Sequence, residues 1–268
     1  MTKGDKFRKA FEEMNVADYE GLLGLLKFRR SIRGFKDAPV PDELIDKILE
    51  AARWSPSAAN SQPWDFVVVK EKETIEKLAE MFEFQRVEKR WLEATRDKKE
   101  QMYPGARFPA LDKQGIVARF KADLEGKSPF RAASHIILPL ADERWCHAFP
   151  LRTHIDKGRQ HIIGSMASAV LAMHLAAASL GLASQWLSDF GSPWLEGVTR
   201  NFLRIPQYFH IYEPLAVGWP AYYPKPRHVK PLEEFVHRET YDPAKSRTEE
   251  EIGEYIDAHL RSGVKRKR

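Results

Sequence analysis

Apolar residues recur at helical spacing in the stretch 41–54 and form one stripe: Leu44, Ile45, Ile48, Leu49 and Ala52. Pro41, Asp42 and Glu43 suit the amino-terminal end of a helix, and the pair Ser55-Pro56 suits its stop. The pattern predicts a helix over 41–54.

A short run of β-branched and aromatic residues, 66–69, follows and predicts a buried strand. The stretches 134–141, 183–188 and 211–218 are further strand candidates. Helical segments, and not tight hairpins, separate these strands, so the pattern predicts a layered α+β domain.

The longest apolar stretch, 160–182, approaches the length of a membrane span. His161, a central His174 and several serines interrupt it, so we predict a buried helix. We expect His174 to be a hydrogen-bonded core residue and not a metal ligand, and we predict no metal site. Small residues along this helix would let another backbone approach closely.

The chain has 268 residues, of which 43% are hydrophobic and 30% charged, enough to bury one large core. We predict one domain over 1–268. Its single cysteine, Cys146, excludes an intramolecular disulfide framework, and the first residues lack the apolar core of a signal peptide, which favours a cytoplasmic location. His147 is adjacent to the thiol but lacks a third orienting group, so a hydrolase is not favoured.

The formal net charge is +5, and the chain ends in four basic residues. Such charge attracts phosphate backbones, so a basic nucleic-acid-binding protein is the non-enzyme alternative. No docking element with polar or aromatic readers accompanies the charge, which disfavours that alternative.

The clearest candidate chemistry lies in the run Arg29-Arg30-Ser31-Ile32-Arg33. Neighbouring guanidinium groups repel one another, so they are typical of an anion site or a solvated face, and their geometry suits phosphate. The later stretch 55–64, SPSAANSQPW, combines stiffening prolines with hydroxyl and amide groups that can read the edge of a heterocycle. Together the two motifs favour a phosphorylated cofactor with a polar ring.

In this order and spacing the two motifs resemble the flavin-binding signature of the nitroreductase family of FMN-dependent NAD(P)H oxidoreductases. The run LGLASQW at 180–186 is similar to the family's segment beside the flavin, and 218–237 is similar to its closing segment. The resemblance implies a nitroreductase-like fold with a central, mostly antiparallel sheet surrounded by helices. It also implies an intertwined homodimer with FMN at the subunit interface.

By the same resemblance, the cofactor-binding residues are Arg29, Arg30, Ser31, Arg33, Pro56, Ser57, Ala58, Asn60, Gln62, Trp186, Ser188, Asp189, Arg227 and Lys230. Arg29, with Arg227 or Lys230, would hold the phosphate. Arg33 would face the pyrimidine edge and stabilise the charge of the reduced flavin. No other residue is assigned a catalytic role.

The turn residues Pro56, Ser57 and Ala58 would come from the partner subunit. Asp189 stands where many family members have a glycine whose amide meets the flavin, and its side chain could donate a proton, alter access or face solvent.

The resemblance implies ping-pong transfer of hydride from NADH or NADPH through flavin N5 to an electron-poor acceptor such as a nitroaromatic or a quinone. No G-x-G-x-x-G fingerprint is present, so the nicotinamide would be a transient substrate. A reductive dehalogenase, a dehydrogenase or a flavin-degrading enzyme of the same fold is the alternative. The variable segment 84–130 falls where the family's substrate lid varies, and 241–268 is a charged tail.

Overall fold

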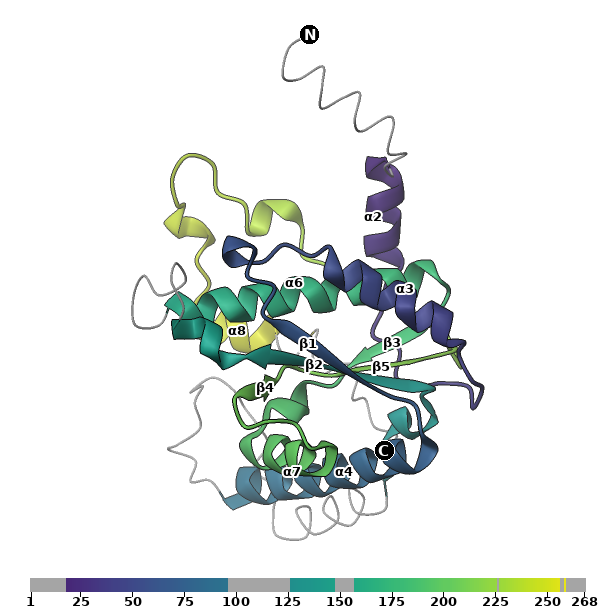
Figure 1. Ribbon diagram of the computed structural model, residues 1–268. Coiled ribbons are helices and arrows are strands. Elements are labelled where there is room, and N and C mark those ends of the chain that lie inside the picture. Colours follow the sequence, from purple (N-terminus) through teal and green to yellow (C-terminus); the bar gives the residue numbers. More distant parts are fainter. Residues whose placement is uncertain (1–17, 96–125, 148–156, 226, 256–257, 259–268) are drawn as a thin grey trace, which may run out of the picture. The chain divides into compact units, whose positions relative to one another are not determined.

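The computed structural model describes residues 18–95, 126–147, 157–225, 227–255 and 258, with the backbone alone for 88–95 (Figure 1). These residues belong to two compact units. The first lies within Met1–Gln85 and Lys127–Pro224, and the second within Arg86–Gly126 and Lys225–Arg268.

The first unit is built on a five-stranded sheet. Its strands are β1 (Trp64–Val69), β2 (His135–Asp142), β3 (Ala183–Trp186), β4 (Phe209–Ile211) and β5 (Leu215–Gly218). The order is β1-β2-β5-β3, with β4 pairing β2, and all these pairs are antiparallel. Every residue of the central strand β2 is buried. The predicted α+β fold with a mostly antiparallel sheet is confirmed.

Helices cover both faces of this sheet (Figure 1). On one face, α3 (Asp42–Arg53) and α6 (Lys157–Ser179) pack against each other and enclose Ile48, Met173 and Leu215. On the other face, the start of α4 (Lys72–Thr95) and α7 (Pro193–Leu203) enclose a second cluster around Leu78 and Phe190. The helix α2 (Tyr19–Phe28) contacts α6.

Short 3-10 helices complete the first unit: η1 (Ala58–Asn60), η3 (Pro129–Ala132), η4 (Glu143–His147) and η5 (Ser188–Gly191). The second unit contains η6 (Leu232–Glu234), η7 (Pro243–Lys245) and α8 (Glu249–Tyr255).

The helix predicted over 41–54 is confirmed to within one residue at each end. The single strand predicted over 211–218 is wrong, because the chain forms β4 and β5 with a break between them. Pro214 has no N–H to donate to a ladder, and Glu213 has a left-handed φ of 34°.

The helix predicted over 160–182 is confirmed as α6, which ends at Ser179, shortly before the left-handed Gly181. Its length and apolar character would suit a membrane span, but 50% of its apolar window is buried inside the protein. His174 is 1% exposed, as expected of a core residue. Of the predicted lid segment 84–130, residues 96–125 lie outside the described part, and Phe130 belongs to the core.

Candidate functional site

The arginine-rich run lies along the free edge of β3. Ser31 forms a parallel bridge with Ser184, and the Ile32 N–H donates to the Ser184 carbonyl at 3.0 Å. Phe35 pairs with Pro220 beyond the end of β5, and Ile32 and Phe35 are both buried in the core. The two apolar side chains thus fix the run against the sheet, and the backbone of Arg33 between them keeps a defined position.

The first two arginines line a small pocket where α2 ends. Leu182, Ser184 and Tyr223 are among its other lining residues. One guanidinium N–H of Arg30 donates to the Arg29 carbonyl at 3.0 Å, while its buried Nε has no partner among the described residues. Guanidinium groups and an unsatisfied donor beside a pocket fit an anionic group such as phosphate.

Two residues at this pocket were not predicted as site residues: Ser184, which lines it, and His174, which contacts Ser184. The Nδ1 of His174 lies 2.7 Å from the Ser184 hydroxyl, and its ring centroid is 5.4 Å from that of Trp186. Burial, followed by the charge of Arg29, lowers the pKa of His174 to about 4, so its ring is neutral at pH 7. Ser184 lies within the LGLASQW run. It is two residues before Trp186 on the strand, so its side chain lies on the same face as that predicted site residue, and this spacing could have identified it.

The predicted residues Ser188 and Asp189 begin η5 directly after β3. The Leu187 N–H donates to the Pro214 carbonyl at 2.8 Å, which fixes η5 beside the break between β4 and β5. Burial raises the pKa of the half-buried Glu213; its contact with Trp186 opposes this shift, and the charge of Asp189 adds to it. A carboxyl group that binds its proton more tightly thus lies near Asp189.

The predicted turn around η1 has an unusual backbone. Three non-glycine residues have left-handed φ values, 52° at Ala59, 52° at Asn60 and 45° at Gln62. Such conformations persist only where the surroundings impose them. Here the Ser57 hydroxyl accepts the Gln62 N–H at 3.0 Å, and the Gln62 amide donates to the Asn60 side chain at 3.2 Å. The exposed amides of Asn60 and Gln62 are therefore held in place.

The turn and the arginine run lie at different positions along α6. The turn is attached at Ser165, whose hydroxyl accepts the Ala58 N–H at 3.1 Å. The arginine run is near His174 and, through its pocket, Ala178. At 1.5 Å per residue, Ser165 and Ala178 are about 20 Å apart along the helix. Within one chain the structure does not bring the two predicted motifs together.

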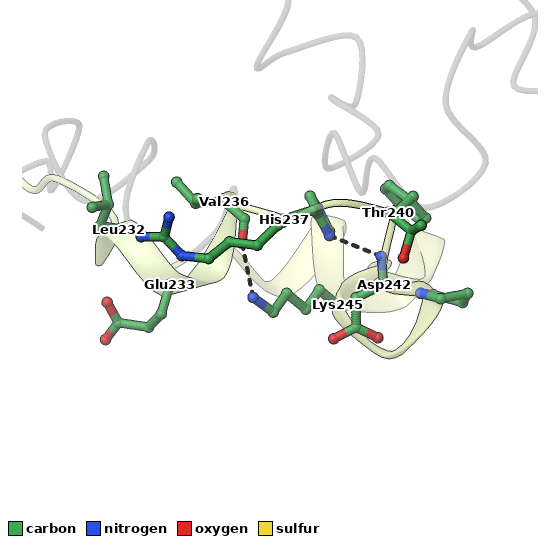
Figure 2. Close-up of a pocket in the computed structure, with 10 residues that line it drawn as sticks. Leu232, Glu233, Val236, His237, Thr240, Asp242 and Lys245 are labelled. Carbon is green, nitrogen blue, oxygen red and sulfur yellow. Dashed lines mark hydrogen bonds between the residues drawn. The ribbon is translucent and has the colours of Figure 1, made fainter.

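Arg227 and Lys230 belong to the second unit, so their predicted role at the phosphate stays a prediction. The Arg227 side chain is exposed, and the Lys230 ammonium lies 4.5 Å from the centroid of the Tyr255 ring. Figure 2 shows an open pocket of about 630 Å³ in the same unit, lined by residues between 232 and 245. It contains none of the predicted cofactor-binding residues.

Other candidate chemistry is weak. Burial raises the pKa of the Cys146 thiol, which makes it a poor nucleophile at neutral pH. Within the described ranges, no group of three or more His, Cys, Asp or Glu side chains could hold a metal ion.

The protein is thus an α+β protein with a basic segment bridged to the edge of an antiparallel sheet whose two faces are covered by helices. A model of the Nitroreductase family matches residues 26–219, which is most of the chain. The protein therefore belongs to the Nitroreductase family.

Two kinds of relative match short segments of the sequence. A protein of Methanothermobacter thermautotrophicus named "Putative NADH dehydrogenase/NAD(P)H nitroreductase" is 52% identical over 60 residues, 22% of this chain and 31% of the relative. Iodotyrosine deiodinase 1 of Rattus norvegicus is 40% identical over 88 residues, 30% of each chain. The matched segments thus span about a third of these relatives.

Among solved structures, B. megaterium NfrA1 has a TM-score of 0.65 at 22% identity and covers 92% of this chain and 87% of its own. A nitroreductase with bound FMN from Bacteroides fragilis has a TM-score of 0.57 at 21% identity, over 83% of this chain and 100% of its own. These similarities confirm the nitroreductase-like fold.

Proposed function

We propose that the protein is an FMN-dependent oxidoreductase: bound FMN would supply hydride transfer at N5 from NAD(P)H to an electron-poor acceptor, such as a nitroaromatic or a quinone, in a ping-pong reaction. The observation that carries the proposal is the arginine run on the edge of β3, beside a pocket with an unsatisfied guanidinium donor. Family membership and the FMN bound to the similar protein from Bacteroides fragilis support it.

The predicted residues would contact different parts of the cofactor. Arg29, Arg30 and Ser31 would bind the phosphate and the adjoining ribityl chain. The exposed guanidinium of Arg33 would lie at the pyrimidine edge, where a cation favours the reduced cofactor. Trp186, Ser188 and Asp189 would border the ring at the end of β3.

We propose that the turn residues Pro56, Ser57, Ala58, Asn60 and Gln62 serve the site of a second subunit. The distance between the turn and the arginine run along α6 supports this arrangement, because one chain does not place both motifs beside one cofactor. The solvent face of α6 has exposed Ile163 and Leu171 next to the small Gly164, a surface suited to close packing of a second copy.

The first test is the visible spectrum of the purified protein, followed by anaerobic addition of NADH and then NADPH. We expect flavin absorption bands that bleach with at least one nucleotide. A colourless protein that takes up no added FMN would refute the proposal and favour the basic nucleic-acid-binding alternative.

The role of Arg33 has its own test. We expect Arg33→Ala to lower the reduction potential of the bound flavin, because the cation near the ring is lost. Lys77→Ala removes the same charge from an exposed position on α4 and serves as the control. An unchanged potential and FMN affinity in Arg33→Ala would show that the assignment is wrong.

The similarity to iodotyrosine deiodinases favours reductive dehalogenation as the second candidate. Incubation of the reduced protein with iodotyrosine, followed by measurement of released iodide, separates the two candidates. Iodide release with poor reduction of nitroaromatics would favour the dehalogenase, and the reverse result would favour the reductase.

A further inference from the structure

We propose that His174 is a positioning residue for phosphate recognition, which it controls by holding Ser184 where β3 meets the arginine run. The inference rests on the proposed function, because it takes the anion to be the phosphate of FMN. It adds a residue that lies on a different element from the predicted binding residues.

The first link is the contact between α6 and β3. His174 and Ser184 are 1% and 2% exposed, and their side chains are joined at 2.7 Å. The other ring nitrogen, Nε2, is buried and has no partner among the described residues. Either neutral tautomer joins the two side chains, because Nδ1 can donate to the Ser184 hydroxyl or accept from it.

The second link joins Ser184 to the arginine run. The backbone of Ser184 accepts the Ile32 N–H and bridges Ser31. Ser184 therefore bonds through its side chain to α6 and through its main chain to the run. A displacement of Ser184 would move Ser31 and the pocket residues Arg29 and Arg30 with it.

The third link is electrostatic. Burial and the nearby Arg29 keep the imidazole neutral, so the ring bonds to the Ser184 hydroxyl without adding a charge. A lysine at this position would add a positive charge in a buried place beside a cation. A neutral, directional hydrogen-bond partner fixes β3, while the arginines would bind the anion.

The competing explanation is that His174 only fills the core. The two explanations differ in their effect on two ligands, FMN and riboflavin, which share the ring and ribityl chain and differ in the phosphate. A general packing defect would weaken both flavins, whereas a positioning defect at the anion end would weaken FMN alone.

The test measures dissociation constants of FMN and riboflavin for the flavin-free full chain by fluorescence quenching. We expect His174→Leu to weaken FMN about fivefold or more, the size of one lost hydrogen bond, and to leave riboflavin within about twofold. His174→Asn, whose side-chain amide can donate to the Ser184 hydroxyl or accept from it near the position of Nδ1, should restore FMN binding. Met173→Leu, at the neighbouring buried position, is the packing control.

The hydroxyl partner gives an independent variant. Ser184→Ala should reproduce the loss of FMN affinity, and adding it to His174→Leu should give little further loss, since both remove the same bond. If His174→Leu fails to fold, Ser184→Ala and His174→Asn decide the question.

Three results would each overturn the positioning role. His174→Leu would weaken FMN and riboflavin equally, His174→Leu would bind FMN as well as Met173→Leu does, or His174→Asn would bind FMN as weakly as His174→Leu. A wild-type protein that binds neither flavin would instead refute the proposed function, and this inference would fall with it.

Discussion

Replacing Ser165 with alanine tests whether α6 holds the predicted flavin-lining turn. The Ser165 hydroxyl is buried, donates to the His161 carbonyl at 2.7 Å and accepts the Ala58 N–H at 3.1 Å. It thereby fixes the start of η1, whose left-handed residues depend on their surroundings.

The magnitude follows from the bonds lost. One hydrogen bond contributes about 1 kcal/mol, and the stranded Ala58 N–H adds a desolvation cost of about 1–3 kcal/mol. Ala58 is only half-buried, so water would satisfy part of this N–H, and alanine is the better helix former by about 0.5 kcal/mol. We expect a net loss of about 1–2 kcal/mol in the free energy of unfolding.

The assay is urea unfolding at one fixed protein concentration, because association with a second copy would stabilise the fold. Ser168→Ala is the matched control. The Ser168 hydroxyl donates only to the Gly164 carbonyl of its own helix, at 2.9 Å, so its loss should be nearly neutral. Equal urea midpoints for the two variants would refute the reasoning, as would an FMN affinity unchanged in Ser165→Ala.

Three further predictions concern the first unit. The hydrogen bond to Glu196 raises the pKa of His210. Burial tends to raise the pKa of Glu196, but the hydrogen bonds from His210 and from a backbone N–H outweigh burial, so the pKa of Glu196 is lowered. The His210 contribution to stability is lost as pH rises through its raised pKa, and the Glu196 contribution as pH falls through its lowered pKa. The free energy of unfolding of the wild type should therefore exceed that of His210→Gln by the largest amount between about pH 5 and 6.5. A difference that does not change with pH would contradict this prediction. Gly158→Ala should destabilise strongly in thermal melts, because its Cβ would lie 2.2 Å from the Cys146 carbonyl oxygen; a melting temperature like wild type would contradict this close packing. Arg131→Met should cost about 2–3 kcal/mol in urea unfolding by stranding the α4 carboxylates that it bonds, and a neutral result would show that water satisfies them.

The sequence predicted the elements whose signal is local. The apolar stripe of 41–54 and the small, apolar run of 160–182 each encode a helix through spacing alone, and both helices are present. The break at Glu213 was missed because the apolar residues on either side read as one continuous strand. Its cause is Pro214, whose missing N–H ends the ladder.

The site was predictable in its residue types and not in its geometry. The arginine run and the polar turn stand out by charge and composition. The left-handed φ of Ala59 was not predictable, since alanine gives no sign of it and tertiary contacts impose it. The contact of His174 with Ser184 depends on how β3 packs against α6. No short sequence motif encodes this packing.

The placement of the two motifs along α6 implies that a single chain folds, whereas two chains would be needed to bind one cofactor. If the turn serves a second subunit, a variant defective in the arginine run and a variant defective in the turn would each lack both sites as a homodimer. Mixed together, they would form dimers in which one site receives two intact motifs and the other receives two damaged ones. Half of the sites in such mixed dimers would recover, so two individually inactive genes could complement each other in one cell.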